Sequence, residues 1–369
     1  MSAHRRPERA AAPITVILDS TALRGHEKRL NLAPLANLAK PAAKAGIIVR
    51  LPFVVMMELA RGGWTETKTH HEAVSRALRA SRQIGLPGPE WPKPDRKEVT
   101  KAIEKAIWSA AEGCDFSILG IPEVSHEDLL RREFRHGKPF KPDGSGYRDA
   151  LIWHSILEYA QEEEPGQIFF VTNNTTDFAN KDGSLDELLA AEAEKAKAKI
   201  ILVKDVHHLI ASHIGPMLNM VNTAVGQPFD KAYPLAKDDL LRALNQHLAG
   251  VTTFSELGDD IGDDNIIERH SPSLGNVEWA RDVGDGNILV QLGAPMYVLG
   301  AYDVSDPHEP PIHEYESGTL TFTIQALIGP DGKLLNAEIL PIQVKDTDLG
   351  ELDELERINL FSKYEDEDQ

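Results

Sequence analysis

Apolar residues in the first 210 positions follow two alternating patterns. Continuous apolar runs of strand length alternate with segments whose apolar residues recur at the spacing of an α-helix. The predicted strands are 14–18, 46–52, 167–172 and 199–203, and the predicted helices are 27–44, 54–62, 65–84, 96–112, 125–137, 147–163 and 205–224. Because strands without polar alternation are buried on both faces, the pattern predicts an α/β fold with a parallel sheet flanked by helices.

The pattern changes after about residue 250. The polar, acidic stretch GDDIGDDN covers 258–265, and short β-rich runs separated by turn residues follow it. The predicted organisation is a mobile arm (1–13), an α/β domain with a helical insertion (14–250), an acidic linker (251–269), a small β-rich domain (270–345) and an acidic tail (346–369).

Two further expectations concern individual residues of the α/β domain. Gly62 is the last residue of the segment 54–62 and Gly63 follows it, and these two glycines are expected to end that helix. Trp108 and Trp153 lie on the apolar faces of predicted helices and are expected in the core.

The formal net charge of −19 is unevenly distributed. Residues 1–255 carry a net charge of +1 and residues 256–369 carry −20. The acidity therefore does not exclude a nucleic-acid substrate for the α/β domain. Cys114 is the only cysteine, which excludes an internal disulfide and a cysteine zinc site. With no apolar run of membrane length either, we expect a cytoplasmic protein without membrane contact.

Four acidic residues are predicted to meet at one edge of the sheet. Asp19 directly follows the first strand, Asp177 follows the strand 167–172, and Glu58 and Asp149 lie near the starts of helices. Ligands of parallel α/β sheets bind at the carboxyl ends of the strands. Four carboxylates repel one another unless a cation lies between them. Hard oxygen ligands suit Mg²⁺ or Mn²⁺, which lower the pKa of bound water and assist phosphodiester hydrolysis.

Each acid also has an ordinary structural explanation. Glu58 would then form an ion pair with Arg61 or Arg50, and the three aspartates would be a helix cap, a helix N-terminal charge and a turn residue. These explanations do not require a shared edge, so the joint placement favours a functional site.

A basic segment precedes Asp149. Its cations are candidates to bind phosphate groups beside the acids, and the alternative is a solvated helix face followed by a basic loop. The candidate substrate-binding residues are Arg131, Arg132, Arg135, Lys138, Lys141 and Arg148.

Four short segments resemble the conserved motifs of the PIN-domain family. They are LDST (18–21), VVMMELARG (54–62), RDALIW (148–153) and VTNNTTDF (171–178), and the resemblance spans about 14–210. It implies a PIN-like fold and a metal-dependent endonuclease of single-stranded RNA, in which Asp19, Glu58, Asp149 and Asp177 are the catalytic metal ligands for Mg²⁺ or Mn²⁺. Thr172 and Asn174 would support them.

The chain also departs from the smallest members of that family. About ninety residues separate Glu58 from Asp149, and a β-rich domain follows. The chain therefore resembles a larger bacterial subgroup with a GYRDALIW pattern. The resemblance implies single-stranded RNA as a partner. It allows a role as a toxin or defence effector with an antitoxin or regulatory protein, and a homodimer.

Three alternatives remain open at the level of sequence. The domain could be a catalytically silent RNA-binding module or a DNA flap nuclease. A receiver-like or phosphatase domain would need a paired acid beside Asp19, where Leu18 and Ser20 stand, and a lysine after a late strand, which Lys204 supplies. The acidic tail could also compete with RNA for the basic segment.

Overall fold

The computed structural model describes most of the chain. The described residues are 13–25, 29–84, 86, 89, 91–219, 228–249, 251, 265–269, 271–304, 312–340, 342 and 347–351. The chain divides into two compact units, residues 1–218 and 219–369, and each is described by itself.

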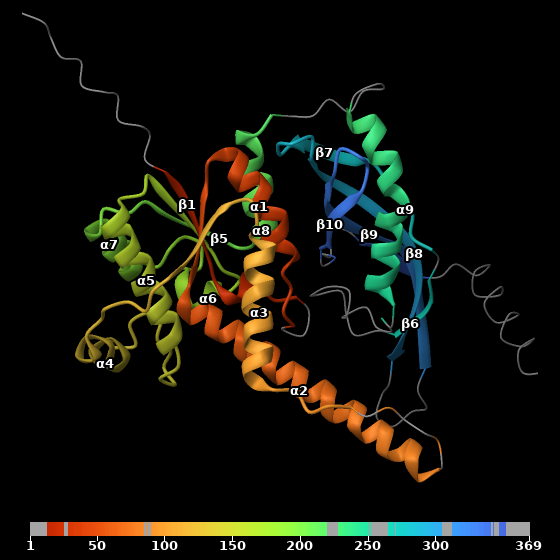
Figure 1. Cartoon of the computed structure of the whole chain (residues 1–369), viewed down its shortest axis with the longest axis horizontal. Helices are drawn as coiled ribbons and strands as arrows, with labels where there is room; N and C mark the ends of the chain where they lie inside the picture. The colour runs from red at the N-terminus through yellow and green to blue at the C-terminus, as the bar shows by residue number, and fades with distance from the viewer. Residues whose placement is uncertain are drawn as a thin grey trace, which may run out of the picture. The chain divides into compact units, whose positions relative to one another are not determined.

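Within the described part of the first unit, five parallel strands form one sheet in the order β3-β2-β1-β4-β5 (Figure 1). The strands are β1 (Ile14–Leu18), β2 (Ile48–Pro52), β3 (Asp115–Leu119), β4 (Gln167–Val171) and β5 (Ile200–Val203). The predicted parallel α/β sheet is confirmed. All five strands run in one direction, so the segments that follow β1 and its neighbours β2 and β4 start at the same edge.

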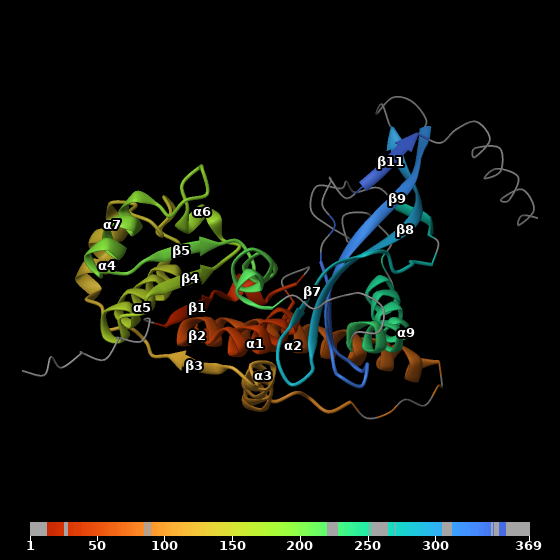
Figure 2. The same ribbon diagram turned by 90° about the horizontal axis from the view of Figure 1, so that it is seen from above.

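Helices cover both faces of this sheet. Figures 1 and 2 show α5 and α7 on one face and α1 and α8 on the other. The helices are α1 (Ala33–Ala45), α2 (Phe53–Gln83), α3 (Arg96–Ala110), α4 (His126–Phe134), α5 (Tyr147–Glu163), α6 (Thr175–Phe178), α7 (Glu187–Lys195) and α8 (Val206–Leu209), with the short turns η1 (Ser20–Leu23), η3 (Ile210–Ile214) and η4 (Gly215–Met217).

The two tryptophans expected in the core differ in how far their side chains are buried. Trp153 is fully buried in α5, as predicted. The prediction for Trp108 is wrong, because its side chain is 45% exposed and contacts Phe116 edge-on, with ring centroids 4.9 Å apart. The apolar face that α3 buries consists of Ile103 and Ile107 instead.

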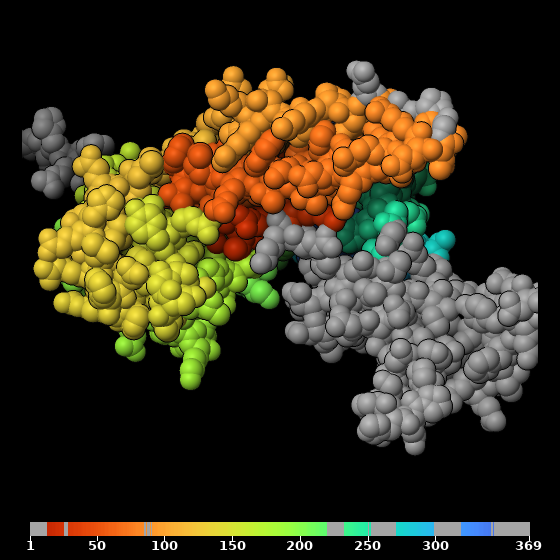
Figure 3. Space-filling model, turned by 90° about the horizontal axis from the view of Figure 1, so that it is seen from below, coloured from red at the N-terminus to blue at the C-terminus, as the bar shows by residue number. Residues whose placement is uncertain are grey.

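The expected helix end at Gly62 and Gly63 is also wrong. Helix α2 runs through both glycines and continues to Gln83. Gly63 is buried against α3, where a Cβ atom would lie 2.3 Å from Cδ1 of Ile103. The glycine therefore allows close helix packing rather than ending the helix. Figure 3 shows the continuous surface that α2 and α3 form, in orange.

Two segments of the first unit differ from the predicted elements. Strand β3 at the sheet edge was not predicted. The predicted helix 205–224 is shorter and irregular in its described part. Helix α8 passes into η3 and then into η4, which contains Pro216, and proline has no N–H for a helical hydrogen bond. Residues 220–224 lie outside the described residues.

The second unit is built on an antiparallel sheet. Six strands form it among the residues described after 219, with the neighbours β10-β9-β8-β6, β11 beside β9 and β7 beside β8. They are β6 (Asn265–Arg269), β7 (Val277–Asp282), β8 (Ile288–Val304), β9 (Ile312–Ile328), β10 (Leu334–Ile339) and β11 (Thr347–Glu351). A separate antiparallel β-rich unit after the α/β unit is therefore confirmed.

Helix α9 (Pro228–Leu248) covers one face of the second sheet. Leu240 and Leu244 of α9 share a hydrophobic core with alternate residues of β8 and β9, among them Leu292 and Phe322. This helix was expected within the first domain, which was predicted to extend to residue 250. The division lies at 218/219 instead, because the apolar face of α9 packs on the antiparallel sheet.

The predicted arm, linker and tail fall largely outside the described residues. Residues 1–12, 252–264 and 352–369 are not described, which covers nearly all of the arm and most of the acidic linker and tail. The described parts of the linker and the tail were not predicted to be strands. They contain β6, which pairs with β8, and β11, which pairs with β9. In the described part of the chain, no helix combines the length and the apolar character that a membrane crossing requires.

Candidate active site

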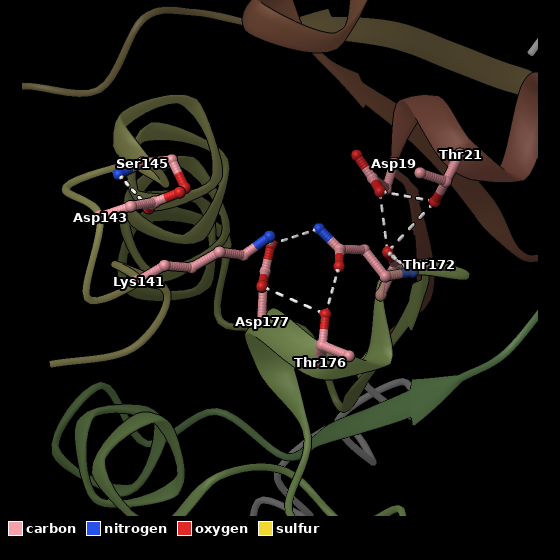
Figure 4. Close-up of polar contacts among 9 residues, drawn as sticks. Asp19, Thr21, Lys141, Asp143, Ser145, Thr172, Thr176 and Asp177 are labelled. Carbon is pink, nitrogen blue, oxygen red and sulfur yellow. Dashed lines mark hydrogen bonds and ion pairs between the residues drawn. The ribbon is translucent and has the colours of Figure 1, made fainter. Parts of the chain in front are cut away.

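Asp19 lies at the carboxyl end of β1, the central strand of the parallel sheet, and is 2% exposed. Its Oδ1 accepts a hydrogen bond from the backbone N–H of Ser20 at 2.6 Å and so caps η1. Its Oδ2 accepts hydrogen bonds from the hydroxyl groups of Thr21 and Thr172, both at 2.7 Å (Figure 4). These three donors fix the rotation of the carboxylate.

The two threonines also join the loops that follow β1 and β4. Thr172 is fully buried, and its hydroxyl accepts a hydrogen bond from the backbone N–H of Asn174 at 3.0 Å. The Thr21 hydroxyl accepts one from the backbone N–H of Asn173, also at 3.0 Å. Side chains on both loops are therefore held at the same edge of the sheet.

Asp177 lies in α6, just after β4, and is 3% exposed. The side-chain amide of Asn174 donates to its Oδ2 at 2.6 Å, and Nζ of Lys141 lies 3.0 Å from the same oxygen. The hydrogen bond between Lys141 and Asp177 is the largest of the causes that raise the pKa of Lys141. Figure 4 shows Lys141 reaching Asp177 from the loop before α5.

The loop before α5 carries Lys141 and leads into the helix turn that carries Asp149. The backbone N–H of Lys141 donates to the carbonyl oxygen of Ser145 at 2.9 Å, which closes the loop. Gly146 has a φ angle of +115°, and a Cβ atom there would lie 2.4 Å from the carbonyl oxygen of Pro139. Glycine therefore allows α5 to start against this loop, with Asp149 in its first turn.

Asp149 lies within electrostatic range of the other three acids. Burial is the largest cause that raises this pKa from 3.8 to about 7, and the negative charges of Asp19, Asp177 and Glu58 raise it further. The positive charge of Lys141 acts in the opposite direction. The like charges around Asp149 therefore disfavour its ionised form.

Glu58 completes this cluster from α2 and forms an ion pair. Nη1 of Arg148 lies 2.5 Å from its Oε1, and the Glu58 side chain is 12% exposed. The structural explanation considered for Glu58 named the wrong arginines. Arg50 pairs with Asp115 at 3.1 Å, and Arg61 forms no ion pair with a described residue.

The donor atoms at this edge fit a hard divalent cation. Carboxylate oxygens are the ligands that Mg²⁺ and Mn²⁺ prefer, and the residues that would hold such an ion are Asp19, Glu58, Asp149 and Asp177. In the arrangement described, no group of three or more Asp, Glu, His or Cys side chains among the described residues is close enough to surround one ion. Two of the carboxylates are instead paired with Lys141 and Arg148.

Two of the six predicted substrate-binding cations, Lys141 and Arg148, lie at the acids. Arg135 is exposed at the end of α4. Arg131 is exposed on the same helix, and its Nη2 lies 2.5 Å from Oε1 of Glu127, one turn earlier.

The other two predicted cations contact residues away from the acids. Arg132 forms a two-pronged ion pair with Glu192, with both N–O distances at 3.0 Å, and Glu192 also accepts a hydrogen bond from Trp153. Lys138 donates to the carbonyl oxygen of Ala179 and lies 3.7 Å from Asp186. Both cations connect the basic segment to the region around α7.

Sequence reasoning missed two features of the site. Thr21 was not singled out, although its position two residues after Asp19 placed a hydroxyl within reach of that carboxylate. The pairing of Glu58 with Arg148 left no signal in the sequence, because the two residues are ninety positions apart and come from different helices.

Comparison with known proteins identifies one family. Residues 16–178 match the family model of the PIN domain, a range that includes all four acids. No curated protein and no solved structure matches the chain.

Proposed function

We propose, from the match of residues 16–178 to the PIN domain, a domain of nucleases, that the chain is a metal-dependent endoribonuclease that cleaves single-stranded RNA. The observation that carries the proposal is the group of acids at one edge of the sheet, where Asp19 and Asp177 are buried. Burial is the largest cause that raises the pKa of Asp149 to about 7, and the negative charges of Asp19, Asp177 and Glu58 raise it further. Asp19, Glu58, Asp149 and Asp177 are the proposed catalytic residues.

We propose that these carboxylates hold Mg²⁺ or Mn²⁺. When bound, such an ion would lower the pKa of a coordinated water and stabilise negative charge on the phosphodiester oxygens. The residues of this chain prepare that site. Hydrogen bonds from Thr21 and Thr172 orient Asp19, and Asn174 orients Asp177.

Lys141 and Arg148 are the proposed phosphate ligands. Both are partly exposed, with side-chain exposures of 44% and 57%, and both already lie against the acidic cluster. A phosphodiester that approaches the cluster would meet their positive charges first. We keep Arg131 and Arg135 as outer phosphate contacts because they are exposed on α4, while the contacts of Arg132 and Lys138 favour a structural role.

A role as a toxin or defence effector, with an antitoxin or regulatory partner, belongs to the same proposal, as does pairing of two copies. Production of an active endoribonuclease of this kind would slow growth of the host cell. Growth with the wild-type chain compared with Asp149→Asn would test that role.

The central test is cleavage of a mixed pool of single-stranded RNA by the full chain with Mg²⁺, Mn²⁺ or EDTA. We expect cleavage with either ion and none with EDTA. Asp149→Asn should reduce the rate by more than about 100-fold, because loss of even an outer partner of a metal ligand costs 10–100-fold. Glu163→Gln is the matched control, since it removes an exposed acid from the far end of α5.

The outcome also separates the proposal from its alternatives. Binding of RNA without cleavage in either metal would contradict the enzyme proposal and favour a silent RNA-binding module. Faster cleavage of a single-stranded DNA flap than of RNA would contradict the substrate assignment. Equal rates for wild type and Asp149→Asn would point to a contaminating nuclease.

A further inference from the structure

A cavity of about 320 Å³ adjoins the acidic cluster. It lies between the start of α2, the start of α3, the first turns of α5 and Ile121, which follows β3. Glu58 and Arg148, which form the ion pair described above, line one side of it. The cavity therefore opens beside the carboxylates rather than at a separate place on the domain.

Apolar side chains form much of the cavity wall and remain accessible. Phe53 is 38% exposed, Met57 49% and Ile121 62%. Three large apolar side chains gathered around one hollow are not explained by packing, because each is left in contact with water. Such clusters typically mark the place where a ligand binds.

The charged residues of the cavity wall are mostly cations. Arg61 and Arg96 line it together with Arg148, and Glu58 is the single acid among the lining residues. The charge of Glu58 is balanced by Arg148. Neither Arg61 nor Arg96 forms an ion pair with any residue that the structure describes. The ligand that this wall favours is therefore apolar in part and carries negative charge.

A nucleotide of single-stranded RNA has this chemistry. We propose that the cavity binds one unstacked nucleobase next to the phosphate that is cleaved. In this arrangement Phe53 and Met57 contact the base and Arg61 and Arg96 bind neighbouring phosphates. The inference rests on the proposed function, since it takes the acidic cluster as the position of the reacting phosphate. Bases splayed out of single strands stack on aromatic side chains, whereas bases within a duplex are not available for this contact.

The cavity would therefore cause the preference for single strands. A duplex could bring a phosphate to the four acids, but its bases would remain paired and stacked outside the cavity. The volume is close to the lower limit of about 300 Å³ for small-molecule sites, which suits a single base. A folded protein partner would not enter a hollow of this size.

The binding site is tested directly by NMR of the full chain with ¹³C-labelled methionine methyl groups. Met57 lies in the cavity wall, and its signal is assigned from the Met57→Leu variant. We expect AMP or UMP without metal to shift the Met57 signal, and ribose 5-phosphate or inorganic phosphate to leave it nearly unchanged. The Met296 methyl group, buried in the second unit, is the internal control.

Binding of a labelled single-stranded RNA supplies the second measurement, made without metal so that no cleavage occurs. Phe53→Ala should weaken binding roughly tenfold, as expected for loss of one stacking contact. Ile84→Asp, an exposed apolar position at the far end of α2 and outside the cavity, should change binding less than about twofold. Arg61→Ala and Arg96→Ala should each reduce the salt dependence of binding by about 0.7 in log–log slope, and Arg76→Ala on the outer part of α2 should not.

The outcomes distinguish this inference from the proposed function. An unchanged Met57 signal at millimolar nucleotide, or equal shifts with ribose 5-phosphate, would overturn the base-binding cavity even if the protein cleaves RNA. A selective shift with no cleavage under any metal would instead leave the cavity in place and overturn the endonuclease. Equal affinity for single-stranded and duplex RNA would contradict its role in strand preference.

Discussion

At the scale of single residues, the candidate site is governed by charge balance. Four carboxylates lie within range of one another, and two of them are paired with Lys141 and Arg148. Asp149 has no such cationic partner among the described residues, and burial together with the three negative charges raises its pKa to about 7. The site therefore carries an electrostatic strain that is concentrated on this residue.

This strain predicts how metal-free stability depends on pH. The folded chain holds a proton on Asp149 up to about pH 7, whereas an unfolded aspartate loses it near pH 3.8. The stability contributed by this proton is present below pH 4 and is lost as pH rises through 7. The shift corresponds to roughly 4 kcal/mol, and solvent screening at this half-buried group reduces the expected effect to about 2 kcal/mol. Asp149→Asn should therefore raise the melting temperature at pH 8 by about 4–8 °C.

Thermal unfolding in EDTA at a series of pH values measures this effect. The gain from Asp149→Asn should shrink towards pH 4, where both side chains are neutral. Glu163→Gln should leave the melting temperature nearly unchanged at every pH. An Asp149→Asn gain that is equal at pH 4 and pH 8 would contradict the electrostatic origin.

The position of Asp19 and Asp177 at one edge of the sheet could be predicted from sequence, but the partners of the acids could not. Asp19 and Asp177 follow strands, and the direction of a parallel sheet is enough to bring strand ends together. The pairing of Glu58 with Arg148 depends on how two long side chains extend across the gap between two helices. A one-dimensional pattern contains no information about that extension, and Arg50 and Arg61 lie much nearer to Glu58 in the sequence than Arg148 does.

At the scale of elements, the close packing of α2 and α3 shapes the cavity wall. Gly63 is buried under Ile103, whereas Gly62, one position earlier, has no atom within 4 Å of the place of a Cβ atom. The two glycines have the same helix propensity but opposite surroundings. They therefore form a matched pair for substitution.

Gly63→Val should lower the free energy of unfolding by roughly 1–3 kcal/mol, because the larger side chain overpacks the contact with Ile103. Gly62→Val should change it by no more than about 0.5 kcal/mol, since valine and glycine differ little in helix propensity. Urea unfolding of both variants measures the difference. Addition of Ile103→Ala should recover part of the loss in Gly63→Val. Equal effects at both glycines would contradict the role of close packing.

The same elements show where sequence patterns fail. The helix 147–163 and the strand 14–18 have clear periodicity and were predicted with the observed bounds. Glycines in a helical pattern indicate either a helix end or a close approach, and only the neighbouring helix decides which. Strand β3 is a short edge strand with burial on part of its length, so its sequence DFSIL carries too weak an apolar pattern.

At the scale of the whole molecule, the two units have separate cores and different charges. Residues 1–218 carry a net charge of +1 and residues 219–369 carry −20. A change of fold class along the chain was predictable, because apolar strands that alternate with helices give way to short β-rich runs separated by turn residues. The boundary was not, because the amphipathic pattern of α9 shows that one face is buried without showing which sheet covers it.

Removal of the acidic unit should increase RNA binding by the first unit. A chain of residues 1–218 should bind single-stranded RNA several-fold more tightly than the full chain at low salt, because it lacks the long-range repulsion from residues 219–369. The difference should vanish near 1 M salt, where the Debye length is about 3 Å. Affinities measured over a salt series test this. Weaker binding of the shortened chain at every salt concentration would show instead that the second unit contributes RNA contacts.

Carboxylates of the site and phosphate groups of the substrate compete for Lys141 and Arg148. In the structure they neutralise Asp177 and Glu58, and in the proposed complex they bind phosphate groups. One ammonium or guanidinium group cannot fully neutralise a carboxylate and a phosphate group at the same time. A divalent ion that takes over the carboxylates would release these side chains to the substrate, and a substrate that draws them away would leave the carboxylates open to the ion. Ion and RNA are therefore linked as heterotropic ligands, and thermodynamic reciprocity requires each to raise the affinity of the other by the same factor.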